Sequence, residues 1–244
     1  AAKRVIDEGG YAVGTKSDLT GGMNSLDKQN VMWGAGIQVA DQAGGYAGFF
    51  THLDNKEGAY AKSAPKLISK QLYNRISATD IRRDWWDPSD KESPYVSKKF
   101  SFANVASFLG DYIYMRVEEM YFTAAEAALR LDDLKSAREL MNTVMAERDP
   151  GYSANNRSGT LLGATTTTWT GSFLENILTH RRIELWGEYG RLFDVRRLGQ
   201  GIDRRTDDGF SEECISMMNR RNVNITKADT YDWVLTIPKA ELDA

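Results

Sequence analysis

The clearest alternation of hydrophobic and polar positions runs from residue 172 to residue 199. Apolar side chains recur there at helical spacing, which predicts an amphipathic helix whose other face carries arginine and glutamate side chains. Ser172, followed three residues later by Glu175, forms a capping-box sequence that marks the start of this helix. Gly187 and Gly190 mark its end, so we predict a core helix with an arginine–carboxylate network around its exit. The apolar positions are Leu174, Ile177, Leu178, Leu185 and Trp186.

A second helical pattern covers residues 112–149 and predicts two helices joined by a short turn at 131–133. Its small and large positions fit a tetratricopeptide-type repeat unit. Because a single unit of this kind cannot bury its own apolar faces, it needs stacked neighbours, and we expect the helix at 172–190 to be one of them. The matching positions are Tyr121, Ala124, Ala125, Ala128, Ala137, Met141, Val144 and Pro150.

The remaining elements are shorter, and the chain as a whole is predicted to be mainly α with long loops and a few short strands. Residues 41–60 combine glycines with aromatic side chains, which predicts a non-helical loop whose aromatics either fold onto the core or face a ligand. Further helices are predicted over 1–8, 63–76, 192–198 and 211–221, and strands or extended runs over 30–40, 97–102 and 231–238.

Charge and composition narrow the classes of function. Lysine and arginine total 31 against 34 aspartates and glutamates, a net charge of −3, so no basic stripe indicates nucleic-acid binding. Charged residues make up 27% of a chain that is therefore globular rather than disordered. No apolar run reaches the ~20 residues of a membrane-spanning helix. With Cys214 as the one cysteine, no internal disulfide is expected.

Four segments together resemble a known family. RRIELWGEYGRLFDVRRLG (181–199) is similar to the C-terminal signature of the SusD/RagB family, the surface nutrient-binding lipoproteins of starch-utilisation-type uptake systems. YMRVEEMYFTAAEAALRL, within 112–131, resembles the last repeat helix of that family. LYNRISATDIRRDWW (72–86) and LTIPKAEL (235–242) resemble its aspartate-then-arginine segment and its terminal tail.

The resemblance implies a SusD-like fold built from tetratricopeptide-type hairpins, and a non-enzymatic protein of the outer-membrane surface that binds glycan or another nutrient. It also implies a partner, a SusC-like TonB-dependent transporter that receives the oligosaccharide. The match extends along the chain but covers about the C-terminal half of a typical member. We therefore expect residues 1–244 to be the C-terminal portion of a SusD-like domain, without the N-terminal repeats. Membrane contact would then come only through a lipid anchor absent from this chain.

Candidate residues for catalysis or metal binding are few. Glu184 and Glu188 lie four positions apart on one helix, but the flanking arginines would keep both ionised, which suits a structural role better than acid catalysis. His180 and Glu184 have helical i,i+4 spacing, yet no second histidine or cysteine ligand accompanies them, so no metal site is predicted. The aspartate-rich loops 87–90 and 203–208 leave a structural calcium site open. We predict neither a catalytic residue nor a cofactor.

Exposed aromatic side chains are the candidate ligand contacts. Sugar rings present apolar C–H faces that stack on flat aromatic rings, while polar side chains bond their hydroxyl groups. The adjacent Trp85 and Trp86 follow a salt-bridged turn, and we expect one of them to be buried and the other to face outward. No binding residue of the family is carried over, because its ligand contacts vary between members. The candidates are Trp33, Tyr46, Trp85 and Trp86, with Trp169 behind them.

Two other functions remain possible at this stage. One is a helical-repeat module that binds a peptide or protein through the hairpin at 112–149. The other is a glycoside hydrolase that uses two carboxylates. Binding of a glycan without turnover separates the binding protein from the hydrolase.

Overall fold

A computed structural model of the chain describes residues 1–40, 48–160, 170–188 and 190–199. Its helices are α1 (Ala2–Glu8), α2 (Lys16–Thr20), α3 (Phe49–Leu53), α4 (Ala59–Ser63), α5 (Lys70–Tyr73), η2 (Ile81–Trp85), α6 (Val117–Arg130), α7 (Leu134–Ala146), α8 (Phe173–Glu184) and α9 (Arg191–Arg197). Its strands are β1 (Val31–Ala35), β2 (Trp86–Asp87), β3 (Val96–Ser97) and β4 (Tyr112–Arg116).

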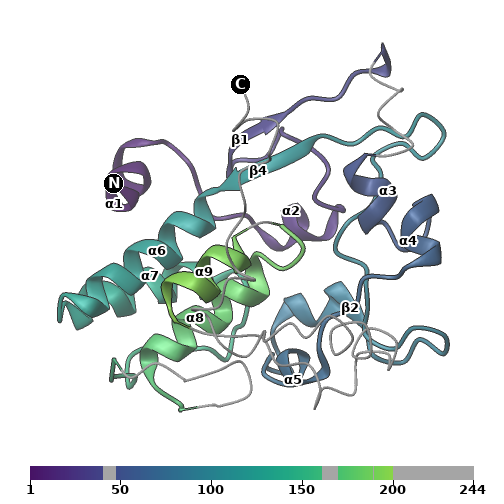
Figure 1. The fold of residues 1–244 in the computed structure, drawn as a ribbon. Helices are drawn as coiled ribbons and strands as arrows, with labels where there is room; N and C mark the ends of the chain where they lie inside the picture. The colour runs from purple at the N-terminus through teal and green to yellow at the C-terminus, as the bar shows by residue number, and fades with distance from the viewer. Residues whose placement is uncertain (41–47, 161–169, 189, 200–244) are drawn as a thin grey trace, which may run out of the picture.

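The longer helices and the shorter ones occupy different sides of the molecule. Figure 1 shows α6, α7, α8 and α9 on one side, α3, α4 and α5 on the other, and the β1–β4 ribbon along one edge. Each side has its own cluster of buried apolar residues. The prediction of a mainly α chain with long loops and a few short strands is confirmed.

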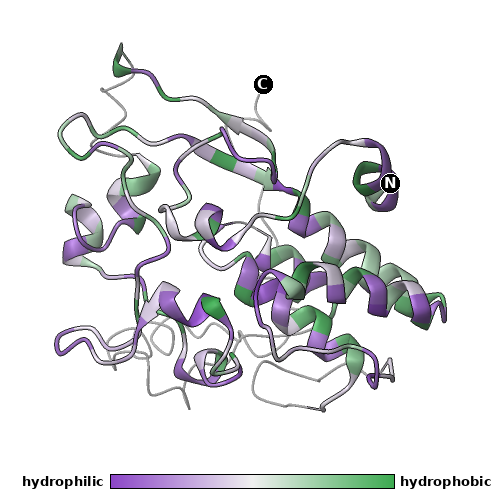
Figure 2. Cartoon of the chain, turned by 180° about the vertical axis from the view of Figure 1, so that it is seen from behind, coloured by the Kyte–Doolittle hydropathy of each residue, from purple (hydrophilic) through white to green (hydrophobic). Residues whose placement is uncertain are grey.

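Helices α6 and α7 form the predicted hairpin, and α8 packs against it as the expected neighbour. The turn between α6 and α7 has Asp132 at φ 60° and Asp133 as a cap, whose carboxylate accepts a hydrogen bond from the Ser136 N–H at 3.0 Å. Figure 2 shows hydrophobic and hydrophilic residues alternating along these helices, as expected for a one-sided core. The buried residues that the three helices share are Phe122, Ala125, Leu129, Ala137, Met141, Val144, Met145, Phe173, Leu174 and Ile177.

The hairpin begins five residues later than predicted, because residues Tyr112–Arg116 form strand β4 rather than the first turns of a helix. β4 pairs antiparallel with β1, the strand predicted within 30–40. Tyr112 and Tyr114 alternate with apolar residues at period two, a strand signal that the strong helical pattern of 117–130 hides in the sequence. Pairing with β1, which is distant in the sequence, makes residues 112–116 a strand rather than a helix.

The predicted non-helical loop at 41–60 is wrong for its second half. Residues 49–53 form α3, residues 59–63 contribute to α4, and Phe50 is buried in the core. A buried aromatic ring contributes enough apolar contact to hold a short helix that its sequence alone does not favour. Residues 41–47 lie outside the described part of the chain.

The single helix predicted over 63–76 is also wrong. α4 ends at Ser63, and the next helix, α5, has only four residues and starts after Ser69. The Ser69 hydroxyl accepts a hydrogen bond from the Leu72 N–H. The residue before Pro65 is sterically pushed out of the helical region, and Leu67 instead forms a bridge with Val96.

Both ends of α8 follow the prediction in most respects. The Ser172 hydroxyl accepts a hydrogen bond from the Glu175 N–H at 3.1 Å, but the Glu175 carboxylate turns to Thr170, so only half of the capping box forms. Gly187 (φ 74°) and Gly190 (φ 107°) take left-handed conformations and redirect the chain into α9, the predicted short second helix.

Several other predictions have more limited outcomes. Of the strand predicted over 97–102, only its first residue belongs to a strand, in β3. The helix predicted over 211–221 and the strand predicted over 231–238 lie outside the described residues. Within the described part of the chain, no helix combines the length and apolar character needed to cross a bilayer.

Candidate functional site

A cluster of buried charges joins the two sides of the molecule. Four basic side chains meet four carboxylates there through salt bridges of 2.5–3.2 Å, so the charges balance. The segments that supply them lie far apart in the sequence, so the cluster exists only in the folded chain. We call this set the buried ion cluster; its members are Asp80, Arg82, Lys99, Arg116, Glu118, Arg148, Glu184 and Glu188.

Glu184 is the centre of the buried ion cluster. Arg148 bonds both of its carboxylate oxygens at 3.0 Å, while Arg116 and Arg82 each add a contact, at 3.0 and 3.1 Å. Burial would raise the pKa of Glu184, but the three guanidinium groups outweigh burial and hold that pKa well below its usual value. The pKa of Glu188 is lowered as well, because Arg116 and Lys99 outweigh the effect of burial. At neutral pH neither carboxyl holds a proton to donate, as predicted, but the basic groups responsible come from distant segments. The neighbouring Arg181 pairs with Glu119 and Asp194 instead.

Lys99 connects the cluster to the aromatic core. Its ammonium donates to the main-chain carbonyls of Glu184 and Trp186, at 2.7 and 2.8 Å, and to the Glu188 carboxylate at 2.5 Å. It also lies 4.7 Å from the centre of the Trp85 ring. Burial lowers the pKa of Lys99 to about 8, while Glu188 opposes that shift.

The buried ion cluster anchors one end of the β1–β4 ribbon. Arg116 is the last residue of β4, and Asn30, just before β1, donates to the Glu118 carboxylate at 2.9 Å. The other end is held by Asp111, whose carboxylate accepts hydrogen bonds from the Leu26 N–H and the Ile37 N–H. Hydrogen bonds to charged side chains, buried at one end and half-buried at the other, therefore fix both ends of a two-stranded ribbon that would be marginal alone.

The ribbon displays an exposed aromatic pair. Trp33 on β1 is 62% exposed and Tyr114 on β4 is 39% exposed, and their ring centres lie 5.1 Å apart at 60°. The register shifts on both sides of Trp33, which indicates a bulge that turns its side chain outward. Of the three predicted contact residues that the structure describes, Trp33 is the one whose ring is open to solvent. We call Trp33 and Tyr114 the aromatic platform.

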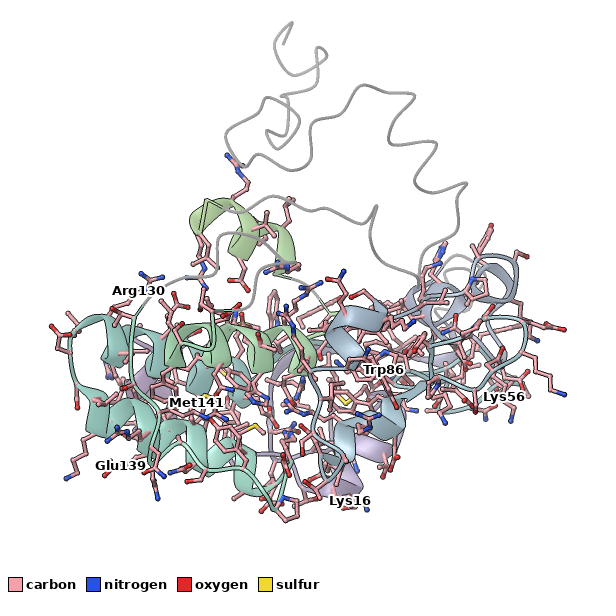
Figure 3. The ribbon with its side chains drawn as sticks, turned by 90° about the horizontal axis from the view of Figure 1, so that it is seen from below. Lys16, Lys56, Trp86, Arg130, Glu139 and Met141 are labelled. Atoms are coloured by element: carbon pink, nitrogen blue, oxygen red, sulfur yellow. The ribbon has the colours of Figure 1, made fainter. Side chains whose placement is uncertain are left out.

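The expectation that Trp85 or Trp86 faces outward is wrong. Trp85 is 4% exposed and Trp86 is 1% exposed, and Figure 3 shows Trp86 among densely packed side chains. The Trp85 indole N–H donates to the Leu19 carbonyl at 3.1 Å, while Trp86 packs edge-on against both Trp85 and Trp186. Both indoles belong to the same buried apolar cluster, so neither ring is left for a ligand to stack on.

The other candidates have different outcomes. Tyr46 and Trp169 lie outside the described residues, so their role in ligand binding stays a prediction. Across the described ranges, no group of three or more histidine, cysteine, aspartate or glutamate side chains could hold a metal ion. In the loop at 87–90, the Asp87 and Asp90 carboxylates accept hydrogen bonds from their own loop instead. The loop at 203–208 is not among the described residues.

Sequence reasoning missed Tyr114 as a site residue. It was assigned to a helix, where it would not lie beside Trp33. The period-two run from Tyr112 to Arg116 was the available signal. Only the pairing with β1 makes that signal decisive.

Gly34 is the position where the ribbon tolerates no side chain. A Cβ atom there would lie 2.4 Å from the Tyr112 carbonyl oxygen and 2.4 Å from Leu26. We expect Gly34→Ala to lower the free energy of unfolding by about 1–3 kcal/mol and to speed amide exchange in both strands. Gly36→Ala is the matched control, because its Cβ would meet nothing closer than 3.9 Å. Urea unfolding and hydrogen exchange measure both variants, and equal behaviour of the two would contradict the close approach at Gly34.

Comparison with known proteins decides the family. The sequence profile of the SusD family matches residues 55–244. The chain belongs to the SusD family. The resemblance of the signature helix and its neighbours is thereby confirmed. Members of the SusD family are generally cell-surface proteins of the outer membrane.

Solved structures of the SusD family have the same fold as this chain. A SusD superfamily protein from Bacteroides thetaiotaomicron superposes with a TM-score of 0.72 at 21% identity, over 100% of this chain and 53% of its own length. A SusD-like carbohydrate-binding protein from Bacteroides vulgatus gives 0.63 at 27% identity, over 82% of this chain and 41% of its own. A putative sugar-binding protein from Bacteroides vulgatus gives 0.65 at 22% identity, with 99% and 52% covered.

The chain therefore spans about half the length of these SusD family structures. Its interpretation as the C-terminal portion of a longer SusD-like domain stays a prediction. No curated protein matches the sequence at a significant level.

Proposed function

We propose that this SusD family chain binds glycan at the bacterial surface without transforming it, and that the aromatic platform contacts the sugar. The observation that carries the proposal is the exposed Trp33–Tyr114 pair on an anchored ribbon. Large aromatic rings left in water are costly unless a partner covers them, and sugar rings offer a matching apolar face. The names of two structural relatives, a SusD-like carbohydrate-binding protein and a putative sugar-binding protein, support the same class of ligand.

The proposal includes delivery of the bound oligosaccharide to a SusC-like TonB-dependent transporter, and attachment to the outer membrane through a lipid anchor. Family membership supports both.

The ionisation state of Glu184 and Glu188 favours binding over hydrolysis, because two carboxylates held ionised by arginine and lysine lack the proton that a glycosidase acid must donate. The apolar faces of α6 and α7 pack against α8, which favours a scaffold over a peptide-binding repeat.

The test is glycan binding by a Trp33→Ala variant. We expect its affinity for a bound polysaccharide to fall about tenfold or more, since roughly 1.4 kcal/mol of stacking contact corresponds to that factor. Affinity gel electrophoresis against a panel of polysaccharides measures it, followed by calorimetry with the one that binds.

Phe193→Ala is the matched control, because Phe193 on α9 is equally exposed, at 61%, but lies outside the ribbon. Its binding should equal that of the parent chain. If Trp33→Ala retains full affinity, the platform is not the sugar contact. Release of reducing ends during the incubation would contradict binding without turnover.

A further inference from the structure

A concave site lies apart from the aromatic platform. A cleft of about 700 Å³ opens between the turn that follows α3, the connection from β2 to β3, and the segment 100–105. This volume falls within the range of small-ligand pockets, roughly 300–1,000 Å³. Neither Trp33 nor Tyr114 is among its lining residues.

Hydrogen bonds hold the walls of the cleft together. The Asp54 carboxylate accepts from the N–H groups of Lys56 and Glu57 in one wall and from the Phe102 N–H in another, each at 3.0 Å. The Asn55 side-chain amide donates to the Ser97 carbonyl at 2.8 Å and so reaches the third wall. Because these hydrogen bonds tie all three segments, the cleft is preformed rather than a gap between loose loops.

The lining combines apolar and hydroxyl-bearing surface. Pro65, Val96 and Val105 contribute aliphatic surface, and Ser93 and Ser101 contribute side-chain hydroxyls. A carbohydrate has both kinds of surface, with C–H faces that need apolar contact and hydroxyls that need donors and acceptors. The chemistry of the cleft therefore fits a short sugar chain better than a purely apolar ligand.

Charge restricts which sugar chain fits. Carboxylates outnumber ammonium groups five to three in the lining, which leaves an excess of negative charge. The Glu57–Lys62 and Asp87–Lys98 pairs, at 3.6 and 3.8 Å, take up two of the lysines. A uronate or sulfate group would meet net repulsion there, whereas a neutral sugar would meet both donors and acceptors. The charged residues are Asp54, Glu57, Asp87, Asp90 and Glu92 against Lys56, Lys62 and Lys98.

We infer that this cleft binds a short neutral oligosaccharide segment and rejects acidic glycans. The inference rests on the proposed function, and it adds a second contact region that sets the class of glycan. The platform supplies stacking surface, and the cleft supplies hydrogen bonds. The excess negative charge of the cleft repels acidic glycans, and we call this selection the charge filter. Figure 3 shows Lys56, at the rim of the cleft, at the opposite end of the view from Glu139 on α7.

The experiment uses the full 244-residue chain and defined oligosaccharides. Calorimetry with maltohexaose, xylohexaose, mannohexaose and hexagalacturonate tests the charge filter, and we expect a neutral probe to bind and the uronate not to bind. The double variant Glu92→Ala with Lys98→Ala removes two exposed rim groups without changing net charge. We expect its affinity for the neutral probe to fall about tenfold or more, because hydrogen bonds to charged groups are lost.

The matched control is Lys135→Ala with Glu139→Ala, which removes an exposed pair of the same charges on α7. It should bind like the parent chain, and both double variants should keep the parent melting temperature because all four side chains are exposed. In a second comparison, Glu92→Lys should admit hexagalacturonate, and Glu139→Lys should not.

The outcomes separate the inference from the proposed function. If the rim variant binds like the parent while Trp33→Ala does not, the cleft is overturned and the platform stands. If only hexagalacturonate binds the parent, the charge filter is overturned while glycan binding stands. If none of the four probes and no polysaccharide of the panel binds, the proposed function itself fails.

Discussion

Glu184→Gln is expected to lower the free energy of unfolding by about 3–5 kcal/mol, the largest effect of any single substitution proposed for this chain. The carboxylate of Glu184 compensates three buried guanidinium groups, those of Arg82, Arg116 and Arg148. Glutamine keeps the shape of the side chain but removes its negative charge. The buried ion cluster would then carry an uncompensated positive charge on side chains that are fully shielded from bulk solvent.

Urea unfolding and thermal melting measure the effect of Glu184→Gln. A loss of this size lowers the melting temperature of a domain of this length by about 6–20 °C. Glu139→Gln makes the same chemical change at a side chain that is 64% exposed, and it should leave stability nearly unchanged. Equal melting temperatures for the two variants would contradict the central role of Glu184.

Acidification is expected to destabilise the folded chain in two stages. The first involves His180, where burial and the nearby Arg82 guanidinium hold the pKa well below its usual value. Arg82 donates to the Nδ1 atom of His180 at 2.9 Å, so the folded imidazole is neutral with its proton on Nε2. Below about pH 6.5 the unfolded chain binds a proton at His180 that the folded chain does not, so stability falls by up to ~1.4 kcal/mol per pH unit.

The second stage begins near pH 4.5, where Glu184 and Glu188 become relevant. Their folded pKa values lie below the usual value of 4.5, so their contribution is fully present above it and is lost as the pH falls through the folded values. Glu126 adds to this stage, because Arg197 and Arg130 outweigh burial and lower its pKa.

Urea unfolding from about pH 8 to about pH 3 tests both stages. His180→Gln cannot titrate, so between about pH 6.5 and about pH 5 its stability should change less than that of the parent chain, while the lower stage remains. Lys99, whose folded pKa is about 8, adds a slope above about pH 7 in both chains. If the pH dependence of stability below about pH 6.5 persists in His180→Gln, a group other than His180 causes the upper stage. His52 is the only other histidine in the sequence.

The core helix at 172–184 and the hairpin at 117–146 were predictable because their signals are local. Helical spacing, a capping serine and turn residues such as Asp133 act within a few positions of one another. The arginine–carboxylate network was also predictable in kind, because glutamates flanked by arginines on a helix that must be buried need buried partners. The partners Arg82, Arg116 and Arg148 were not, because no local pattern brings them to Glu184.

The exposure of the candidate site residues also depends on distant segments and was therefore not predictable. Trp33, Trp85 and Trp86 have the same side chain, and the sequence offered no way to rank their exposure. Trp85 and Trp86 are buried because Leu19, Lys99 and other distant residues close around them. Trp33 is open because the bulge on both sides of it, formed where β1 pairs with β4, turns its ring outward.

By itself the sequence determined the family, the helical repeat unit and the capped helix with its glycine exit. Those properties follow from contacts between near neighbours and from the types of residue present. Only the tertiary structure decided where β4 begins, which tryptophan faces solvent, and how the cleft at 54–105 is built. Each of these depends on pairing between distant segments, and the free energy of such pairing is not encoded in any one stretch of the chain.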